Sequence, residues 1–195
     1  MGERNIVKKI ILYTIGCMII GLGNVCYIQA GLGSTSFTIL SQGISMNTPL
    51  SVGESNQILF AAIVLVLLFA DRKMLRIGML LNIILVGEFM DLFLQMDIMR
   101  SDLLVVRLAV LGLGVLLYPA GVTITIAADL GPGPVDSLMQ LLKKKTGADV
   151  ALVRILMDSA MVAAGMVMGA VVGVGTLAGA FLTGVLLKKF LKFVR

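Results

Sequence analysis

Long apolar stretches, separated by short polar or glycine-rich segments, dominate this sequence. Crossing about 30 Å of hydrocarbon takes roughly 20 residues of helix, and a soluble domain needs no apolar stretch of that length. The pattern therefore predicts six membrane-crossing helices, the fourth of them long enough to tilt or kink. The expected helices cover residues 10–30, 52–70, 77–95, 103–128, 150–170 and 175–187.

Two glycine-rich interruptions occupy equivalent places in the two halves of the chain, 98 positions apart. Each follows a long apolar stretch and precedes a short expected helix, over 34–46 in the first half and 134–145 in the second. Irregular backbone at membrane depth is stable only where it is buried in protein or lines a cavity, so we expect the functional centre here. The residues expected to break the helices are Gly33, Gly131, Pro132, Gly133, Pro134, Gly175 and Thr176.

A constant offset of 98 positions aligns residues of the first half with similar residues of the second. The matched pairs include Gly16 with Gly114, Gly23 with Gly121, and Leu32 with Leu130. Each half, 10–97 and 103–195, contains three expected crossings, and because three is odd the second half must be inverted. The predicted fold is all-α: one membrane domain, residues 1–195, of six transmembrane helices in two inverted three-helix repeats, each with a break and short helix after its first crossing.

The short helices after the breaks allow two interpretations. If both dip into the membrane, the free N–H groups at their N-termini approach the midplane and favour an anion or a carboxylate. Ser34 or Thr35 is placed to cap the first of these helices. The alternative is that each helix lies flat at its interface and only connects two crossings.

Composition supports a membrane protein: 58% of the residues are hydrophobic and 14% charged, with a mean hydropathy of +1.04. The net charge of +5 does not indicate nucleic-acid binding, because the basic residues cluster at the ends of apolar stretches, where membrane topology explains them. Both termini are expected on the cytoplasmic side of the membrane. The basic residues then on that side are Arg4, Lys8, Lys9, Arg72, Lys73, Arg76, Lys143, Lys144, Lys145, Lys188, Lys189, Lys192 and Arg195.

The residues of redox, metal and catalytic sites are scarce. The chain has no His, and its two cysteines, Cys17 and Cys26, lie inside the first apolar stretch, where packing is the expected role. We therefore expect no metal site and no cofactor. With no convincing pair of nucleophile and base, an enzyme is the least favoured class of function.

Charged residues inside apolar stretches are costly and mark candidate functional positions. Arg154 and Asp158 are one helical turn apart near the expected midplane, so they can form an ion pair. This pair has two interpretations of equal weight, a fixed link between helices and a ligand or ion site. Glu88 and Asp91 lie three positions apart with no nearby basic residue, so a proton or cation is expected to relieve their repulsion. Their alternatives are an interfacial Asp91 and a Glu88 that accepts a hydrogen bond from another helix.

Asp136 lies in the first turn of the second short helix, where capping of free N–H groups is favoured over substrate contact. The substrate-binding hypothesis nevertheless includes it, together with polar residues of both breaks and of the intramembrane pair. The complete set is Asp136, Ser137, Arg154, Asp158, Ser34, Thr35 and Ser36.

Several short motifs in this order resemble the YczE/YyaS/YitT-type bacterial membrane proteins, over nearly the whole chain. They are residues 31–36, residues 49–53, Pro134-Val135-Asp136, Arg154 with Asp158, and Gly175-Thr176. The resemblance implies a multi-pass, transporter-like protein of the bacterial cytoplasmic membrane. By motif match, Pro134, Asp136, Arg154, Asp158, Gly175 and Thr176 are the family-type positions. Val135 departs from the bulky aromatic residue or glycine that relatives often carry there.

The leading functional hypothesis is a small secondary transporter or exporter of an unknown small molecule or ion, with its site between the two breaks. The alternative is a non-transporting membrane partner that supports another enzyme or complex. One bundle of six helices is small for an alternating-access cycle, so a homodimer is a further expectation. A ladder of Gly165, Gly169 and Gly173 offers a surface for close packing or dimer contact.

Overall fold

The computed structural model describes residues 2–97 and 99–194, and the ordered elements in this part of the chain are all helices. This confirms the predicted all-α class. The elements are α1 (Gly2–Ala30), α2 (Ser36–Asn47), α3 (Val52–Ala70), the short 3-10 helix η1 (Arg72–Met74), α4 (Ile77–Met96), α5 (Leu104–Ala127), α6 (Pro134–Thr146), α7 (Val150–Val167) and α8 (Val174–Val194).

Five of the described helices are long and apolar enough to cross a membrane, which supports a multi-pass protein. They are Ile6–Ala30, Val52–Ala70, Ile77–Met96, Leu104–Ala127 and Val174–Lys192. The expected fifth crossing corresponds to α7, which is not among them and ends at Val167 rather than at residue 170. The sixth crossing therefore stays a prediction.

The two chain ends depart most from the predicted boundaries. Helix α1 begins at Gly2 rather than at residue 10, and α8 continues to Val194 rather than ending at Leu187. Lysine and arginine are good helix formers whose aliphatic stems lie along apolar surface, so the basic segments extend the helices instead of ending them. Met1 and Arg195 lie outside the described residues.

The first short helix, α2, begins at Ser36, two residues later than predicted. Thr35 occupies the N-cap position, but its side chain makes no capping hydrogen bond. Its hydroxyl oxygen instead lies 2.8 Å from that of Thr38, one turn into the helix. By contrast, Ser51 and Glu54 form a reciprocal capping box that starts α3 at the predicted residue.

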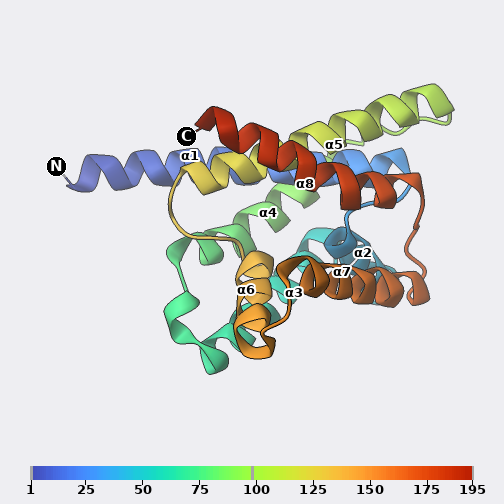
Figure 1. Ribbon diagram of the computed structural model, residues 1–195. Coiled ribbons are helices and arrows are strands. Elements are labelled where there is room, and N and C mark those ends of the chain that lie inside the picture. The colour runs from blue at the N-terminus through green and yellow to red at the C-terminus, as the bar shows by residue number, and fades with distance from the viewer. Residues whose placement is uncertain (1, 98, 195) are drawn as a thin grey trace.

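Helices α1 and α5 pack side by side along their lengths (Figure 1). Glycines let their backbones approach at two places. A Cβ atom at Gly121 would lie 2.8 Å from the carbonyl oxygen of Gly16, and one at Gly114 would lie 3.0 Å from that of Gly23. Side chains larger than hydrogen are therefore excluded from both crossing points.

The last long helix of each half is tied to the interruption of the other half. The backbone N–H of Gly78, in the first turn of α4, donates to the carbonyl oxygen of Leu130 at 3.1 Å. The N–H of Gly175, in the first turn of α8, donates to that of Leu32 at 2.7 Å. The short helices also reach the opposite half, since α2 packs against α7 as well as α3, and α6 packs against α3 as well as α7.

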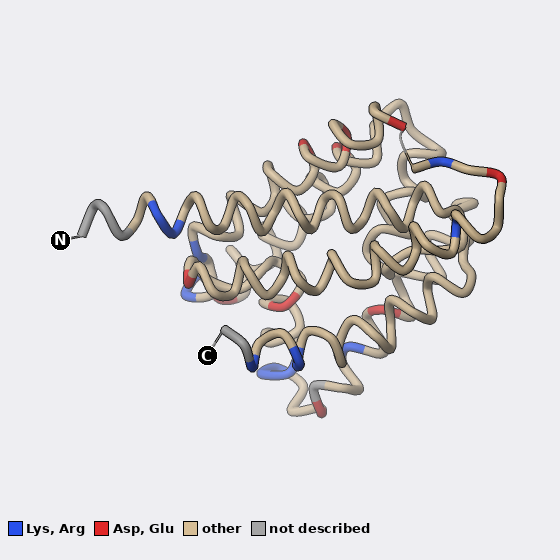
Figure 2. Tube along the Cα trace, turned by 90° about the horizontal axis from the view of Figure 1, so that it is seen from above, with Lys and Arg blue, Asp and Glu red and all other residues tan. Residues whose placement is uncertain are grey.

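Charged residues lie mostly near the ends of the bundle (Figure 2). At one end, Lys9 pairs with Asp129 at 2.8 Å and Lys144 pairs with Asp71 at 2.7 Å. The start of α1 and the end of α8 lie toward this same end (Figure 1). At the opposite end, Arg107 donates to the carbonyl oxygens of Ala30, the last residue of α1, and of Gly31, which follows it.

The expected glycine ladder is not an outward-facing surface. Gly165 packs against Ile39 of α2, and Gly173 packs against the carbonyl oxygen of Leu32. Gly169 lies beyond the end of α7 with a φ of 95°, a conformation that suits glycine. The three glycines do not form a ladder on one helix, because α7 ends before Gly169. Close packing is confirmed for Gly165 and Gly173, and the homodimer stays a prediction.

Candidate functional site

A cavity of about 150 Å³ lies between the two interruptions. Both short helices contribute their first turns, with Ser36 at the start of α2 and Pro134 at the start of α6. Part of its wall is aromatic and consists of Phe37, Phe60 and Tyr118. The two breaks of the sequence therefore meet at one internal space.

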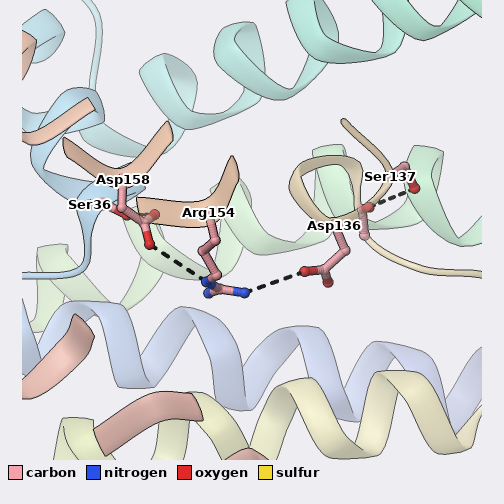
Figure 3. Close-up of polar contacts among 6 residues, drawn as sticks. Ser36, Asp136, Ser137, Arg154 and Asp158 are labelled. Atoms are coloured by element: carbon pink, nitrogen blue, oxygen red, sulfur yellow. Dashed lines mark hydrogen bonds and ion pairs between the residues drawn. The ribbon is translucent and has the colours of Figure 1, made fainter. Parts of the chain in front are cut away.

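Arg154 lies between two carboxylates in this cavity, and Figure 3 shows Asp136 and Asp158 directed at it from opposite sides. Its Nε atom is 3.5 Å from Asp158 Oδ2, one helical turn away on α7. Its Nη1 atom is 3.9 Å from Asp136 Oδ1 on α6. Asp158 also accepts a hydrogen bond of 2.5 Å from the hydroxyl of Ser36. The cluster thus joins α2, α6 and α7.

Asp136 faces the cavity rather than the free amides of its own helix. Helix α6 begins with Pro134 after Gly133, and its N-cap residue offers no side-chain capping bond. The described contact of the Asp136 carboxylate is the one with Arg154, so the capping prediction is wrong for this residue. Burial raises the pKa of the Asp136 carboxyl above its usual range, and the nearby Arg154 guanidinium offsets only part of this.

A second polar group in the cavity comes from the first half of the chain, and sequence reasoning gave it no site role. The hydroxyl of Thr38 donates to Asn24 Oδ1 at 3.1 Å. Asn56 is buried, and its Nδ2 atom has no hydrogen-bond partner within the described part of the chain. The signal was available in the offset of 98, since Thr38 and Asn56 are the counterparts of Asp136 and Arg154.

Several predicted site residues lie outside the cavity. Ser137 donates to the carbonyl oxygen of Gly133 at 3.0 Å, and Ser34 is buried away from the lining. Glu88 is exposed and accepts a hydrogen bond of 3.2 Å from Gln57. Asp91 accepts hydrogen bonds from the Ser51 hydroxyl and the Gly53 N–H at the start of α3. The two acidic residues of α4 are thus separate from the Arg154 cluster.

The predicted break residues divide between the lining and its support. Gly131, Gly133, Pro134 and Thr176 line the cavity, as do Thr35 and Ser36. Gly33 and Gly131 adopt φ values of 98° and 110°, which residues with a Cβ rarely adopt. Gly175 supports the first break through its hydrogen bond to Leu32.

Comparison with known proteins places the chain in a family. Residues 7–192 match the model of DUF6198, described as a family of unknown function. The chain belongs to DUF6198. An "Uncharacterized membrane protein YczE" of Bacillus subtilis is 33% identical over 187 residues, covering 95% of this chain and 86% of YczE.

Two further relatives also match along most of their length. An uncharacterised protein of Haemophilus influenzae is 31% identical over 188 residues, covering 96% of this chain and 85% of that protein. The "Uncharacterized protein YyaS" of Bacillus subtilis is 27% identical over 189 residues, covering 95% of this chain and 94% of YyaS. No solved structure matches this chain. The predicted YczE and YyaS relationship of this DUF6198 protein is confirmed, and the YitT relationship stays a prediction.

Proposed function

We propose that this DUF6198 protein is a small secondary transporter or exporter of the bacterial cytoplasmic membrane, and not an enzyme. The observation that carries the proposal is the internal cavity at the meeting point of the two breaks, with the Arg154 cluster on its wall. Transporters with inverted repeats bind their substrates at such a place, near the bilayer midplane, between interrupted segments.

Paired contacts support the inverted repeat. At the offset of 98, exchanging the halves converts the contact of Gly16 with Gly121 into the contact of Gly114 with Gly23, and both are present. The hydrogen bond from Gly78 to Leu130 likewise becomes the one from Gly175 to Leu32, with the shift of one residue at the glycines. Contacts related in this way are expected of two inverted halves around a pseudo-two-fold axis in the membrane plane.

The cavity lining follows the same relation. Lining residues occur as pairs 98 positions apart, one from each half: Ile20 with Tyr118, Asn24 with Val122, Thr35 with Gly133, Ser36 with Pro134, Phe37 with Val135, Thr38 with Asp136, Asn56 with Arg154 and Phe60 with Asp158. The cavity thus lies across the proposed axis, where a small relative movement of the halves opens it toward either side.

The exposure of the Arg154 cluster favours ligand binding over a fixed link between helices. The side chain of Arg154 is 50% exposed, and those of Asp136 and Asp158 are 40% and 30% exposed. A purely structural ion pair gains from tight packing and full hydrogen bonding, because each buried charge is costly to desolvate. Here all three residues are partly exposed and line the cavity.

The direct test is whether the cavity opens to each side of the membrane. Single cysteines at Val122 on α5 and Val162 on α7, both half-buried lining residues, would report on it. They would be placed in a Cys17→Ala/Cys26→Ala background, because these are the native cysteines. We expect a membrane-impermeant maleimide to label both positions in right-side-out vesicles and also in inside-out vesicles.

Sidedness controls make this result interpretable. Cysteines at Lys73 and Asp102 should each be labelled in only one type of vesicle, because the α3–α4 and α4–α5 connections that contain them lie at opposite ends of the bundle (Figure 1). Cavity cysteines labelled from one side only, or from neither, would contradict the transporter. That outcome, with a partner protein retained through purification in mild detergent, would favour the accessory protein.

A further inference from the structure

The charges in the cavity do not balance. Of the described lining residues, three are charged: Asp136, Arg154 and Asp158. Two carboxylates and one guanidinium leave one formal negative charge. An uncompensated charge in a low-dielectric interior is costly, so one further positive charge is favoured in the cavity.

The unbalanced charge belongs mainly to Asp136. Asp158 has two partners, the hydroxyl of Ser36 at 2.5 Å and the Nε atom of Arg154 at 3.5 Å. Asp136 has only the longer contact of 3.9 Å to Arg154 among the described residues. The guanidinium therefore compensates Asp158 more closely and leaves Asp136 open to a second partner.

The groups facing Asp136 allow two ways of neutralising it. Helix α7 presents Arg154 with Asp158 behind it, α5 presents Tyr118, and α1 presents Tyr13. Arg154 is the single cation among them, and the N-terminal N–H groups of α6 add only a partial positive charge. Because the carboxyl pKa stays raised beside Arg154, a proton is one neutralising partner. A cation that enters the cavity is the other.

Size and wall chemistry favour an organic cation over a bare metal ion. A cavity of about 150 Å³ is the size that holds benzene in an engineered protein core. Phe60 and Tyr118 line the cavity, and the faces of aromatic rings attract cations. The unpartnered Nδ2 atom of Asn56 supplies a donor for a hydroxyl or other acceptor on the same ligand.

We propose that the cavity takes a small monovalent organic cation with an apolar body, and that this cation replaces a proton on Asp136. This inference rests on the proposed transport function and names its substrate class. When the cation binds, the Asp136 O–H bond breaks and the proton passes to water, so the cavity carries the same net charge in both states. If the cavity can change its side of opening with either the cation or the proton bound, the protein exchanges the cation for a proton across the membrane.

Four molecules of nearly equal shape separate charge from shape in a calorimetric binding experiment on the full chain. Choline is a cation, and 3,3-dimethylbutan-1-ol is its neutral isostere. Glycine betaine is a zwitterion, and 3,3-dimethylbutanoate is its anionic isostere. We expect choline to bind roughly tenfold or more tightly than the neutral alcohol, because only choline pairs with Asp136 and the aromatic faces.

Proton release supplies the second measurement. Titrations in two buffers of different ionisation enthalpy give the number of protons released as choline binds. We expect a release that approaches one proton at acidic pH, where Asp136 is protonated. The choline affinity should rise up to tenfold per pH unit over that range. Asp136→Asn should abolish both the release and the preference for charge, whereas Asp71→Asn, an equal change outside the cavity, should alter neither.

The wild-type panel decides the proposal even if Asp136→Asn does not fold. Equal binding of choline and its alcohol, or no binding by any of the four, would overturn the cation proposal. So would preferred binding of the anion or the zwitterion. The transporter proposal is judged separately, because two-sided labelling of Val122→Cys and Val162→Cys requires no ligand.

Discussion

Asp136 combines a half-buried position on the cavity wall with one distant ionic partner among the described residues, which makes it the most informative single residue of this protein. Its carboxylate lies on the cavity wall 3.9 Å from Arg154. Burial and the Arg154 charge act on its pKa in opposite directions, and burial is the larger effect. The folded protein therefore holds a proton on Asp136 at pH values where an unfolded chain has lost it.

This raised pKa predicts a pH-dependent stability difference between the wild type and Asp136→Asn. The contribution of protonated Asp136 is fully present below the ordinary value of 3.8 and is lost as pH rises through the raised value. The melting temperature of the wild type should therefore increase relative to that of Asp136→Asn as pH is lowered from 8 to 5.

Asp71→Asn is the matched control, because a hydrogen bond from Lys144 lowers the pKa of Asp71. Its stabilising contribution is present above the ordinary value and is lost as pH falls. The exposed Lys144–Asp71 pair should contribute little to stability, and its contribution should change with pH in the opposite direction to that of Asp136. A wild-type advantage over Asp136→Asn that is constant with pH would contradict a raised pKa at Asp136.

Single residues also show where sequence reasoning ends. The pairing of Arg154 with Asp158 follows from a spacing of one helical turn, so it is predictable from the sequence. The contact of Arg154 with Asp136 joins two helices whose packing the sequence does not determine. The sequence favours capping for Asp136, because it shows the position of this residue in its own helix but not which other helix packs against it. The tertiary contact with α7 changes that role.

At the scale of elements, glycines near helix starts position the two breaks. Gly175 opens α8 and donates its N–H to Leu32. A Cβ atom here would collide with the carbonyl oxygen of Gly33. Gly184, on the same helix, has open space around it. One helix thus contains a tightly packed glycine and an unconstrained one.

This contrast predicts different outcomes for Gly175→Ala and Gly184→Ala. Gly175→Ala should destabilise the protein by about 1–3 kcal/mol, because the new methyl group forces the first break to move. Gly184→Ala should be neutral or stabilising by up to about 1 kcal/mol, since alanine is the better helix former. Denaturant unfolding in detergent measures both. Equal effects would show that the break does not contact α8 as described.

Elements were predictable where local chemistry defines both ends. Helix α3 matches its predicted bounds because Ser51 and Glu54 cap its start and the charged connector follows its end. The starts of α1 and α2 and the end of α8 were misplaced. Basic side chains extend a helix as readily as they end it, and the Thr35 hydroxyl contacts Thr38 rather than capping α2.

At the scale of the whole molecule, residues from both halves of the chain line one cavity. Glycine contacts between α1 and α5 bring the first helices of the halves together. The packing of α2 and α6 against helices of both halves brings both breaks to the same space. The matched glycines that led to the predicted repeat are visible in the sequence. The packing partners of α2 and α6 were not predictable, because no sequence pattern specifies which helices they contact.

If α7 crosses the membrane, each half contains three crossings and the second half is inverted relative to the first. Full-length chains with one cysteine, at Ala148 before α7 or at Val171 after it, would be labelled in intact cells with an impermeant maleimide. The background would be Cys17→Ala/Cys26→Ala. We predict that Val171→Cys is labelled from outside and Ala148→Cys only after permeabilisation. Labelling of both positions from the same side would mean that α7 does not cross, and would contradict the inverted repeat.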